Sequence, residues 1–212
     1  MYISVENYKG MYLNGKDAEA LRDEIEKLRR EIAKVKNKLE SPANSYNVRM
    51  LSADADAVNV YKGYLSCAIE YLSDISGNSP EYTEEEKASM VFDSAVGDIS
   101  CITLTAGRYL QNKYELVLTD DKAILTELHL DEGAVSREIN VTVARETIRS
   151  MHFGEWRESY LPEHYGCTLN EPTRWQLRVD YLSGSAPRFF DGVGVFPYNF
   201  SSLARLFGAD VV

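Results

Sequence analysis

The clearest pattern of apolar positions lies between residues 17 and 40. Apolar residues recur there at alternating spacings of four and three, an a/d heptad repeat, and they are Leu21, Ile25, Leu28, Ile32, Val35 and Leu39. Asp17 offers an N-cap before the repeat, and Pro42 marks its end. The spacing predicts a coiled-coil-like helix over residues 17–40, with these side chains buried in a helix–helix seam.

A second helical pattern occupies residues 54–76 and leaves two partners open for the first helix. Its apolar positions are again three and four apart, at Val58, Tyr61, Leu65, Ala68, Leu72 and Ile75. In one arrangement the two helices close into an antiparallel hairpin through residues 41–53. In the other, residues 17–40 pair with a second copy of the chain. That homodimer would be parallel, because Glu24 and Glu31 then face Arg29 and Lys36 of the other copy. Both arrangements can hold at once.

The first fourteen residues alternate weakly, which suggests a short β-hairpin. Thr83 and Glu86 form a capping box for a helix that stops near Gly97. From residue 98 the period changes to two, as expected for strands. The strands expected from this pattern span residues 99–106, 114–119, 123–130 and 175–181, with a further partner strand near 188–191.

Two more helices are expected in the second half of the chain, over residues 141–152 and 200–207, with Gly208 ending the last one. The three strands between residues 99 and 130 are joined by short turns and should form an antiparallel meander. The sequence therefore predicts an α+β fold with two domains. Residues 1–80 would form a short hairpin and a helical region, and residues 81–212 an antiparallel sheet with a few packed helices.

The last third of the chain resembles a pattern that recurs in uncharacterised bacterial proteins. The residues that carry it are FGEWRESY, RWQLRVDYLSG and FFDGVGVFPYNFSSLARLF. The shared pattern is a W-x-L strand, a turn and a G-x-x-x-Y-P-x-N-F stretch that leads into a final helix. It covers roughly residues 99–207, and it departs at Phe196, where Tyr is expected, and in the loop 161–173. The resemblance implies an α+β domain and no activity. Trp156, Trp175 and Phe200 are interpreted as core residues.

The charge of the chain argues against a nucleic-acid-binding protein. It has 33 acidic and 23 basic residues, a formal net charge of −10, whereas phosphate contacts need clustered Lys and Arg. Residues 51–100 hold ten acids against only Lys62 and Lys87. We expect a basic protein partner to contact the acids Glu84, Glu85, Glu86, Asp93 and Asp98. The competing interpretation is that these acids only form a solvated helix face.

Candidate chemistry is sparse. Cys67, Cys101 and Cys167 form no CxxC pair, and His129, His152 and His164 lack the convergent ligands that zinc needs. Gly192 and Gly194 only partly match a dinucleotide loop. We expect no metal, cofactor or catalytic residue. With no signal peptide or long apolar run, a cytoplasmic protein that does not enter a membrane is expected.

Two hypotheses for function remain. The first is a non-enzymatic protein-interaction protein. A more specific version of this hypothesis is an acidic inhibitor, similar to phage-borne or anti-CRISPR proteins, that covers the nucleic-acid site of a basic enzyme. The tyrosines, 14 in all, could contribute to such an interface. The alternative is a hydrolytic or nucleolytic enzyme whose dispersed site would bring together His152, Glu155 or His164.

Overall fold

A computed structural model describes residues 2–42, 52–78, 81–129 and 133–209 of the chain. The fold is α+β, and it divides into two compact units. The helical unit comprises Met1–Leu39 and Arg49–Thr83, and the sheet unit comprises Glu40–Val48 and Glu84–Val212. The chain therefore enters the sheet unit at Glu40, returns to the helical unit, and enters the sheet unit again at Glu84.

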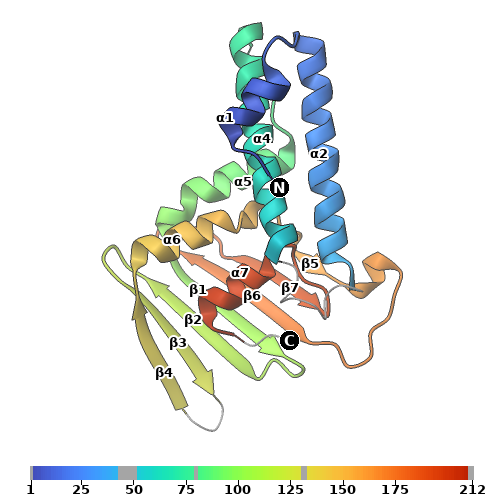
Figure 1. Cartoon of the computed structure of the whole chain (residues 1–212). Coiled ribbons are helices and arrows are strands. Elements are labelled where there is room, and N and C mark those ends of the chain that lie inside the picture. Colours follow the sequence, from blue (N-terminus) through green and yellow to red (C-terminus); the bar gives the residue numbers. More distant parts are fainter. Residues whose placement is uncertain (1, 43–51, 79–80, 130–132, 210–212) are drawn as a thin grey trace. The chain divides into compact units, whose positions relative to one another are not determined.

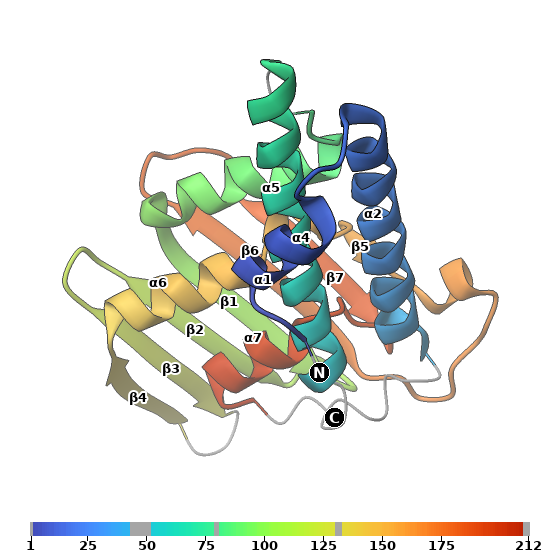
Figure 2. The same ribbon diagram turned by 45° about the horizontal axis from the view of Figure 1, so that its top comes forward.

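The helical unit is built from two long helices and a short N-terminal helical segment. The long helices are α2 (Ala18–Glu40) and α4 (Ser52–Ser76), and the short segment joins α1 (Val5–Tyr8) to the π-helix η1 (Lys9–Leu13). The Asp17 side chain accepts a hydrogen bond from the Ala20 amide at 2.9 Å, which confirms the predicted cap of α2. In both views α2 and α4 run antiparallel (Figure 1, Figure 2). The segment that would close them into a hairpin lies outside the described residues, so that closure stays a prediction.

The short β-hairpin expected at the N-terminus is wrong, because residues 5–13 are helical. Ser4 caps α1 by accepting a hydrogen bond from the Asn7 amide at 3.2 Å. Tyr8 and Tyr12 are four residues apart, which places their rings on one helical face, where they stack with centroids 5.1 Å apart. The weak alternation of apolar residues in this segment is equally compatible with that helical spacing.

The predicted seam of α2 is buried within a single chain. Leu21, Ile25, Leu28, Ile32 and Leu39 are all buried, whereas Val35 is only half-buried. Ile25 lines a shallow groove together with Ile69 and Leu72 of α4. Since one chain already buries most of the seam, a parallel homodimer through residues 17–40 would have to open it or use another surface.

The sheet unit contains one sheet, in which the described residues supply seven strands in the order β4-β3-β2-β1-β6-β7-β5. The strands are β1 (Ile99–Gly107), β2 (Asn112–Leu118), β3 (Ala123–His129), β4 (Gly133–Ile139), β5 (Ser159–Tyr160), β6 (Arg174–Tyr181) and β7 (Arg188–Val193). All neighbours pair antiparallel except β5 and β7. The meander and the β6–β7 pair agree with the predicted strands. The edge strands β4 and β5 were not predicted.

One face of the sheet carries the core. The helices α5 (Glu84–Ala95), α6 (Val141–Ser150) and α7 (Phe200–Phe207) all lie on this face in Figure 2. Their buried residues form a single cluster with the inward residues of the strands and with the 3-10 helix η3 (Phe153–Glu155). Trp156, Trp175 and Phe200 are at most 5% exposed, which confirms them as core residues.

Two glycines allow close packing in this core. A Cβ atom at Gly192 would collide with the Trp175 indole, and a Cβ atom at Gly154 would collide with the backbone carbonyl of Ala88 on α5. Glycine at position 192 of strand β7 therefore makes room for the Trp175 indole. This packing accounts for the glycine, and a dinucleotide-binding loop is not needed to explain it.

Glu40, the last residue of α2, is buried in the sheet unit at 4% exposure. Its Oε1 accepts a hydrogen bond from the Tyr198 amide at 3.3 Å, and its Oε2 accepts one from the Tyr165 hydroxyl at 3.4 Å. The Arg157 guanidinium lies 3.8 Å from the same Oε2. A buried carboxylate is costly unless it is paired in this way, so these contacts within the sheet unit stabilise the buried Glu40 side chain.

Candidate functional site

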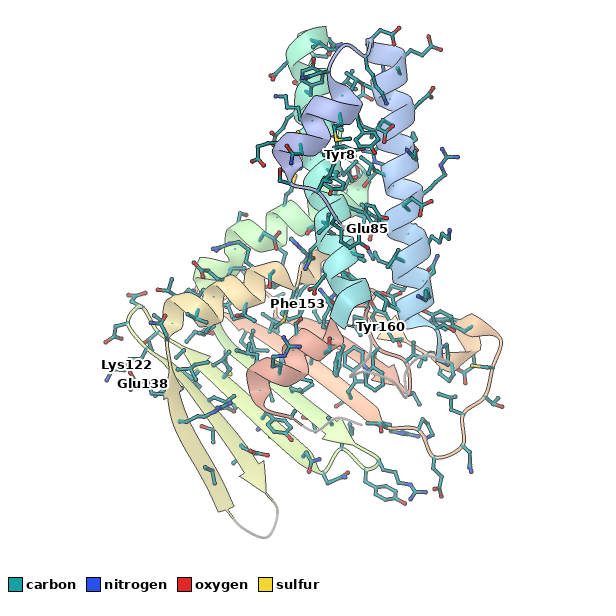
Figure 3. All side chains as sticks on the ribbon, viewed as in Figure 1. Tyr8, Glu85, Lys122, Glu138, Phe153 and Tyr160 are labelled. Carbon is teal, nitrogen blue, oxygen red and sulfur yellow. The ribbon has the colours of Figure 1, made fainter. Side chains whose placement is uncertain are left out.

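The acids predicted to face a partner divide into two groups. At the start of α5, Glu84 and Glu85 are exposed and Glu86 is half-buried (Glu85 is labelled in Figure 3). Glu84 forms an ion pair with Lys87 one turn later, at 2.7 Å. Exposed pairs of this kind contribute little to stability, so these acids remain available to shape the surface potential.

Asp93 and Asp98 are instead engaged within the fold. Asp98 Oδ1 accepts a hydrogen bond from the Ser183 amide at 3.0 Å, which fastens the turn after β6. Asp93 Oδ2 lies 2.9 Å from His152 Nδ1, just beyond the end of α6. These two carboxylates stabilise the sheet unit, and a role in partner contact for them stays a prediction.

Asp93, His152 and Ser89 together resemble a catalytic triad in composition but not in geometry. Both Asp93 Oδ2 and Ser89 Oγ contact the same ring nitrogen of His152, Nδ1, at 2.9 and 3.3 Å. A triad needs the serine on Nε2 and the carboxylate on Nδ1, so that the ring passes a proton between them. The cluster therefore joins α5 to the turn at His152, which has a left-handed φ of 47°.

The other residues of the enzyme hypothesis do not add a recognisable centre. Glu155 follows His152 in the same turn and donates its amide hydrogen to the His152 carbonyl at 2.9 Å. His164 is exposed on a separate 3-10 helix, η4 (Pro162–Tyr165). Among the described residues, no three His, Cys, Asp or Glu side chains gather in a group that could hold a metal ion.

The net charge of the chain belongs almost entirely to the sheet unit. This unit has 21 acidic and 12 basic residues, a net of −9, whereas the helical unit has 12 and 11, a net of −1. The acidic segment 51–100 spans both units, and in the helical unit the many Lys and Arg residues of α2 offset its acids. The field that would attract a basic partner therefore comes from the sheet unit.

The face of the sheet opposite the core is open. Side chains alternate along each strand, and in β6 Trp175, Leu177 and Val179 are buried while Gln176 and Arg178 between them are exposed. The described helices of the sheet unit, α5 to α7, contribute to the core on the other face. We call this surface the open sheet face, and by register its residues are Cys101, Thr103, Thr105, Lys113, Glu115, Val117, Ile124, Thr126, Leu128, Ala134, Ser136, Glu138, Arg174, Gln176, Arg178, Asp180, Phe189 and Asp191.

Three apolar side chains, one each from β1, β2 and β3, form a short row on this face between Asp180 on β6 and Glu138 on β4. Cys101 on β1 lies opposite Val117 on β2, and Val117 lies opposite Ile124 on β3. Val117 and Ile124 are 36% and 39% exposed, more than core residues would be. Phe189 on β7 is 58% exposed and adds an aromatic ring to the same face.

Arg178 links the polar and aromatic parts of the open sheet face. Its Nε and Nη2 donate to the Asp180 carboxylate at 2.7 to 3.0 Å, a two-pronged contact. Its guanidinium carbon lies 5.4 Å from the centre of the Phe189 ring, within the range of a cation–π contact. These contacts place the Phe189 ring beside the Arg178 guanidinium, and both residue types are common among the residues that dominate binding at interfaces.

Cys101 provides a chemical test of this surface. Burial raises the pKa of its thiol, and the nearby Glu115 and Asp180 carboxylates raise it further, although the Thr103 hydroxyl acts in the opposite direction. Since the thiolate is the reacting form, a raised pKa leaves less of it at a given pH. In a Cys67→Ser, Cys167→Ser chain, we expect iodoacetamide to modify Cys101 several-fold more slowly than free cysteine near pH 8, with the rate still rising above pH 9.

Intact-mass measurements at several pH values would follow this reaction. The same chain in guanidinium chloride is the control, because unfolding should restore the rate of free cysteine. An equal rate for the folded chain and free cysteine near pH 8 would contradict the surroundings described for Cys101.

Comparisons with known proteins give no further constraint. No family model matches the chain, and the searches of curated proteins and of solved structures found no match. None of the described helices combines the length and apolarity needed to cross a membrane.

Proposed function

We propose that this protein is a non-enzymatic protein-interaction protein that binds a basic protein partner through the open sheet face. The observation that carries the proposal is the row of exposed apolar side chains on that face, with Phe189 held beside Arg178. Contiguous exposed apolar groups with polar neighbours are typical of protein-binding surfaces. Protein interfaces are also enriched in aromatic residues and arginine.

The charge of the sheet unit supports a basic partner. A net charge of −9 produces a long-range field that accelerates encounter with a positively charged protein. The open sheet face itself is nearly balanced, because its bases Arg174, Lys113 and Arg178 face the acids Glu115, Glu138, Asp180 and Asp191. In this proposal the field of the unit governs association, and the apolar row with Phe189 governs how long the complex lasts.

The same charge favours a nucleic-acid-binding enzyme as the class of partner. Such enzymes present basic surfaces to phosphate groups, and an acidic protein can occupy that surface by matching its potential. The proposed role is then inhibition by coverage of the nucleic-acid site in the cytoplasm. No specific observation favours the hydrolytic alternative, since Asp93 and Ser89 contact the same nitrogen of His152.

Kinetic measurements on a captured partner test the proposal. Affinity purification from the native cell followed by mass spectrometry would identify the partner, and association and dissociation would then be measured at two salt concentrations. Reversing Glu84, Glu85 and Glu86 to Lys should slow association more than it speeds dissociation, and added salt should have the same effect. Phe189→Asp should raise the dissociation rate at least about tenfold.

Val91→Asp is the matched control for Phe189. Val91 is an exposed apolar residue on α5 of the same unit, 69% exposed, but it lies away from the open sheet face. Each variant needs a melting curve, because the three glutamates also stabilise the start of α5 through the helix dipole. Salt-independent affinity, together with normal binding by folded triple-reversal and Phe189→Asp variants, would refute the proposal.

A further inference from the structure

Five tyrosines of the helical unit line one hollow of about 380 Å³. The five are Tyr2, Tyr8, Tyr12, Tyr61 and Tyr64. They come from segments distant in sequence, and no sequence motif marks them.

The floor of the hollow is a stack of three tyrosine rings. Tyr8 lies between Tyr64, with ring centres 4.0 Å apart, and Tyr12, at 5.1 Å. Tyr8 and Tyr64 are nearly fully buried, whereas Tyr12 is 44% exposed and Tyr2 is 50% exposed at the rim. The Tyr64 hydroxyl is fixed because it donates to the Ile3 carbonyl at 2.6 Å. The ring faces are thus held in place before any ligand arrives.

A buried carboxylate lies beneath this stack. The Tyr8 hydroxyl points from α1 toward α2 and donates to Glu24 Oε1 at 2.7 Å (Tyr8 in Figure 3). Lys16 and Lys27 also contact the Glu24 carboxylate, at 2.9 and 3.3 Å. Burial alone would raise the pKa of Glu24, but these three contacts outweigh it and hold the pKa below its ordinary value. The carboxylate therefore stays ionised at neutral pH.

The chemistry of the lining favours a cation. Tyrosine ring faces attract positive charge, and Glu31 adds a second carboxylate to the lining beside Glu24, whose own charge Lys16 and Lys27 already offset. The helical unit already contains one such contact, because the Lys9 ammonium lies 5.1 Å from the centre of the Tyr71 ring.

We propose that the tyrosine hollow binds an arginine side chain of the basic partner. This inference rests on the proposed function for the existence of that partner, and it adds a second, specific contact in the helical unit. A guanidinium group is planar, so it can stack on Tyr12 or Tyr61 while its N–H groups donate toward Glu31. An ammonium group lacks the planar face that matches this stack.

A titration with N-acetyl-arginine amide tests the chemistry without the partner. The full chain would be labelled with 3-fluorotyrosine and followed by fluorine NMR, with Tyr12→Phe used to assign one signal. We expect saturable shifts for Tyr12 and Tyr61. Glu31→Gln should weaken binding at least about threefold, and the uncharged isostere N-acetyl-citrulline amide should bind at least about fivefold more weakly.

Tyr109 is the internal control, because it is 80% exposed and lies in the sheet unit. The inference fails if the arginine and citrulline compounds bind equally, or if Tyr109 responds as Tyr12 does. It also fails if a captured partner depends on Phe189 but binds Tyr12→Leu and Glu31→Gln normally, an outcome that leaves the proposed function intact. Saturable arginine binding with no basic partner would support the hollow and count against the proposed function.

Discussion

Replacement of Gly154 by alanine is expected to lower the unfolding free energy of the sheet unit by about 3 kcal/mol or more. Gly154 packs against the backbone of α5, and its new Cβ would collide with the carbonyl of Ala88 and the Cα of Ser89. Backbone atoms cannot rotate away as a flexible side chain can. Displacing α5 would also disturb the edge-to-face contact of Phe92 with Phe153 and the bond of Asp93 to His152.

Tryptophan fluorescence during urea unfolding measures this effect in the correct unit. The chain has two tryptophans, Trp156 and Trp175, and both are buried in the sheet unit. Gly97→Ala is the matched control, since Gly97 has open space at its Cβ position and no positive φ; it should change stability by no more than about 0.5 kcal/mol. Equal urea midpoints for the two variants would show that the packing of α5 on η3 is looser than described.

Ile32→Asp is expected to cost the helical unit about 3 kcal/mol or more, because it places an unpaired charge in an apolar seam. Val35→Asp provides the comparison. Both residues are β-branched, lie in the heptad repeat and are one turn apart, but Ile32 is 9% exposed and Val35 is half-buried. If the seam is filled within one chain, Val35→Asp should cost clearly less.

Circular dichroism during urea unfolding, with the solution mass of each variant, distinguishes the two arrangements of α2. A seam within one chain predicts unequal losses of stability and an unchanged mass. A parallel homodimer predicts that both substitutions destabilise alike and that the mass falls. The second result would show that a second copy buries Val35, contrary to its exposure in the single chain.

The elements that could be predicted from the sequence are those whose signal is local. Heptad spacing located α2, and the alternation from Trp175 to Val179 located β6 and its two faces. Helix ends followed from single residues: Asp17 caps α2 by accepting from the Ala20 amide at 2.9 Å, and Gly208 ends α7 with a φ of 66°. Each signal depends on neighbours within about one turn, so it survives without knowledge of the fold.

The missed elements take their structure from partners distant in the chain. Strand β4 is exposed along most of its length, so it has no alternating pattern, and its pairing with β3 alone defines it. At the N-terminus, Tyr8 is held by contacts to Glu24 and Tyr64 that a short window cannot include. The weak alternation there is compatible with either structure, and the local signal for a helix is the cap at Ser4.

The same limit applies to the functional surfaces. The net charge of residues 51–100 does not show that these acids belong to two different units. In the helical unit, the Lys and Arg residues of α2 offset their charge. The sequence could not distinguish the engaged Asp93 from the exposed Glu84, because the partner of Asp93, His152, lies 59 residues away in the chain. Alternation in β6 does indicate an outward face, but only the strand order places Phe189 beside Arg178, and Arg178 beside Thr103.

The burial of Glu40 also imposes an order of events on the newly made chain. Its two partners, Tyr165 and Tyr198, lie 125 and 158 residues later in the sequence. At about 5–20 residues per second, a ribosome needs roughly 10–30 s to reach Tyr198 after it has added Glu40. During that interval the carboxylate stays hydrated at the end of α2, while the heptad residues can already pair with α4. The burial of Glu40 within the sheet unit is therefore among the last steps of folding during translation.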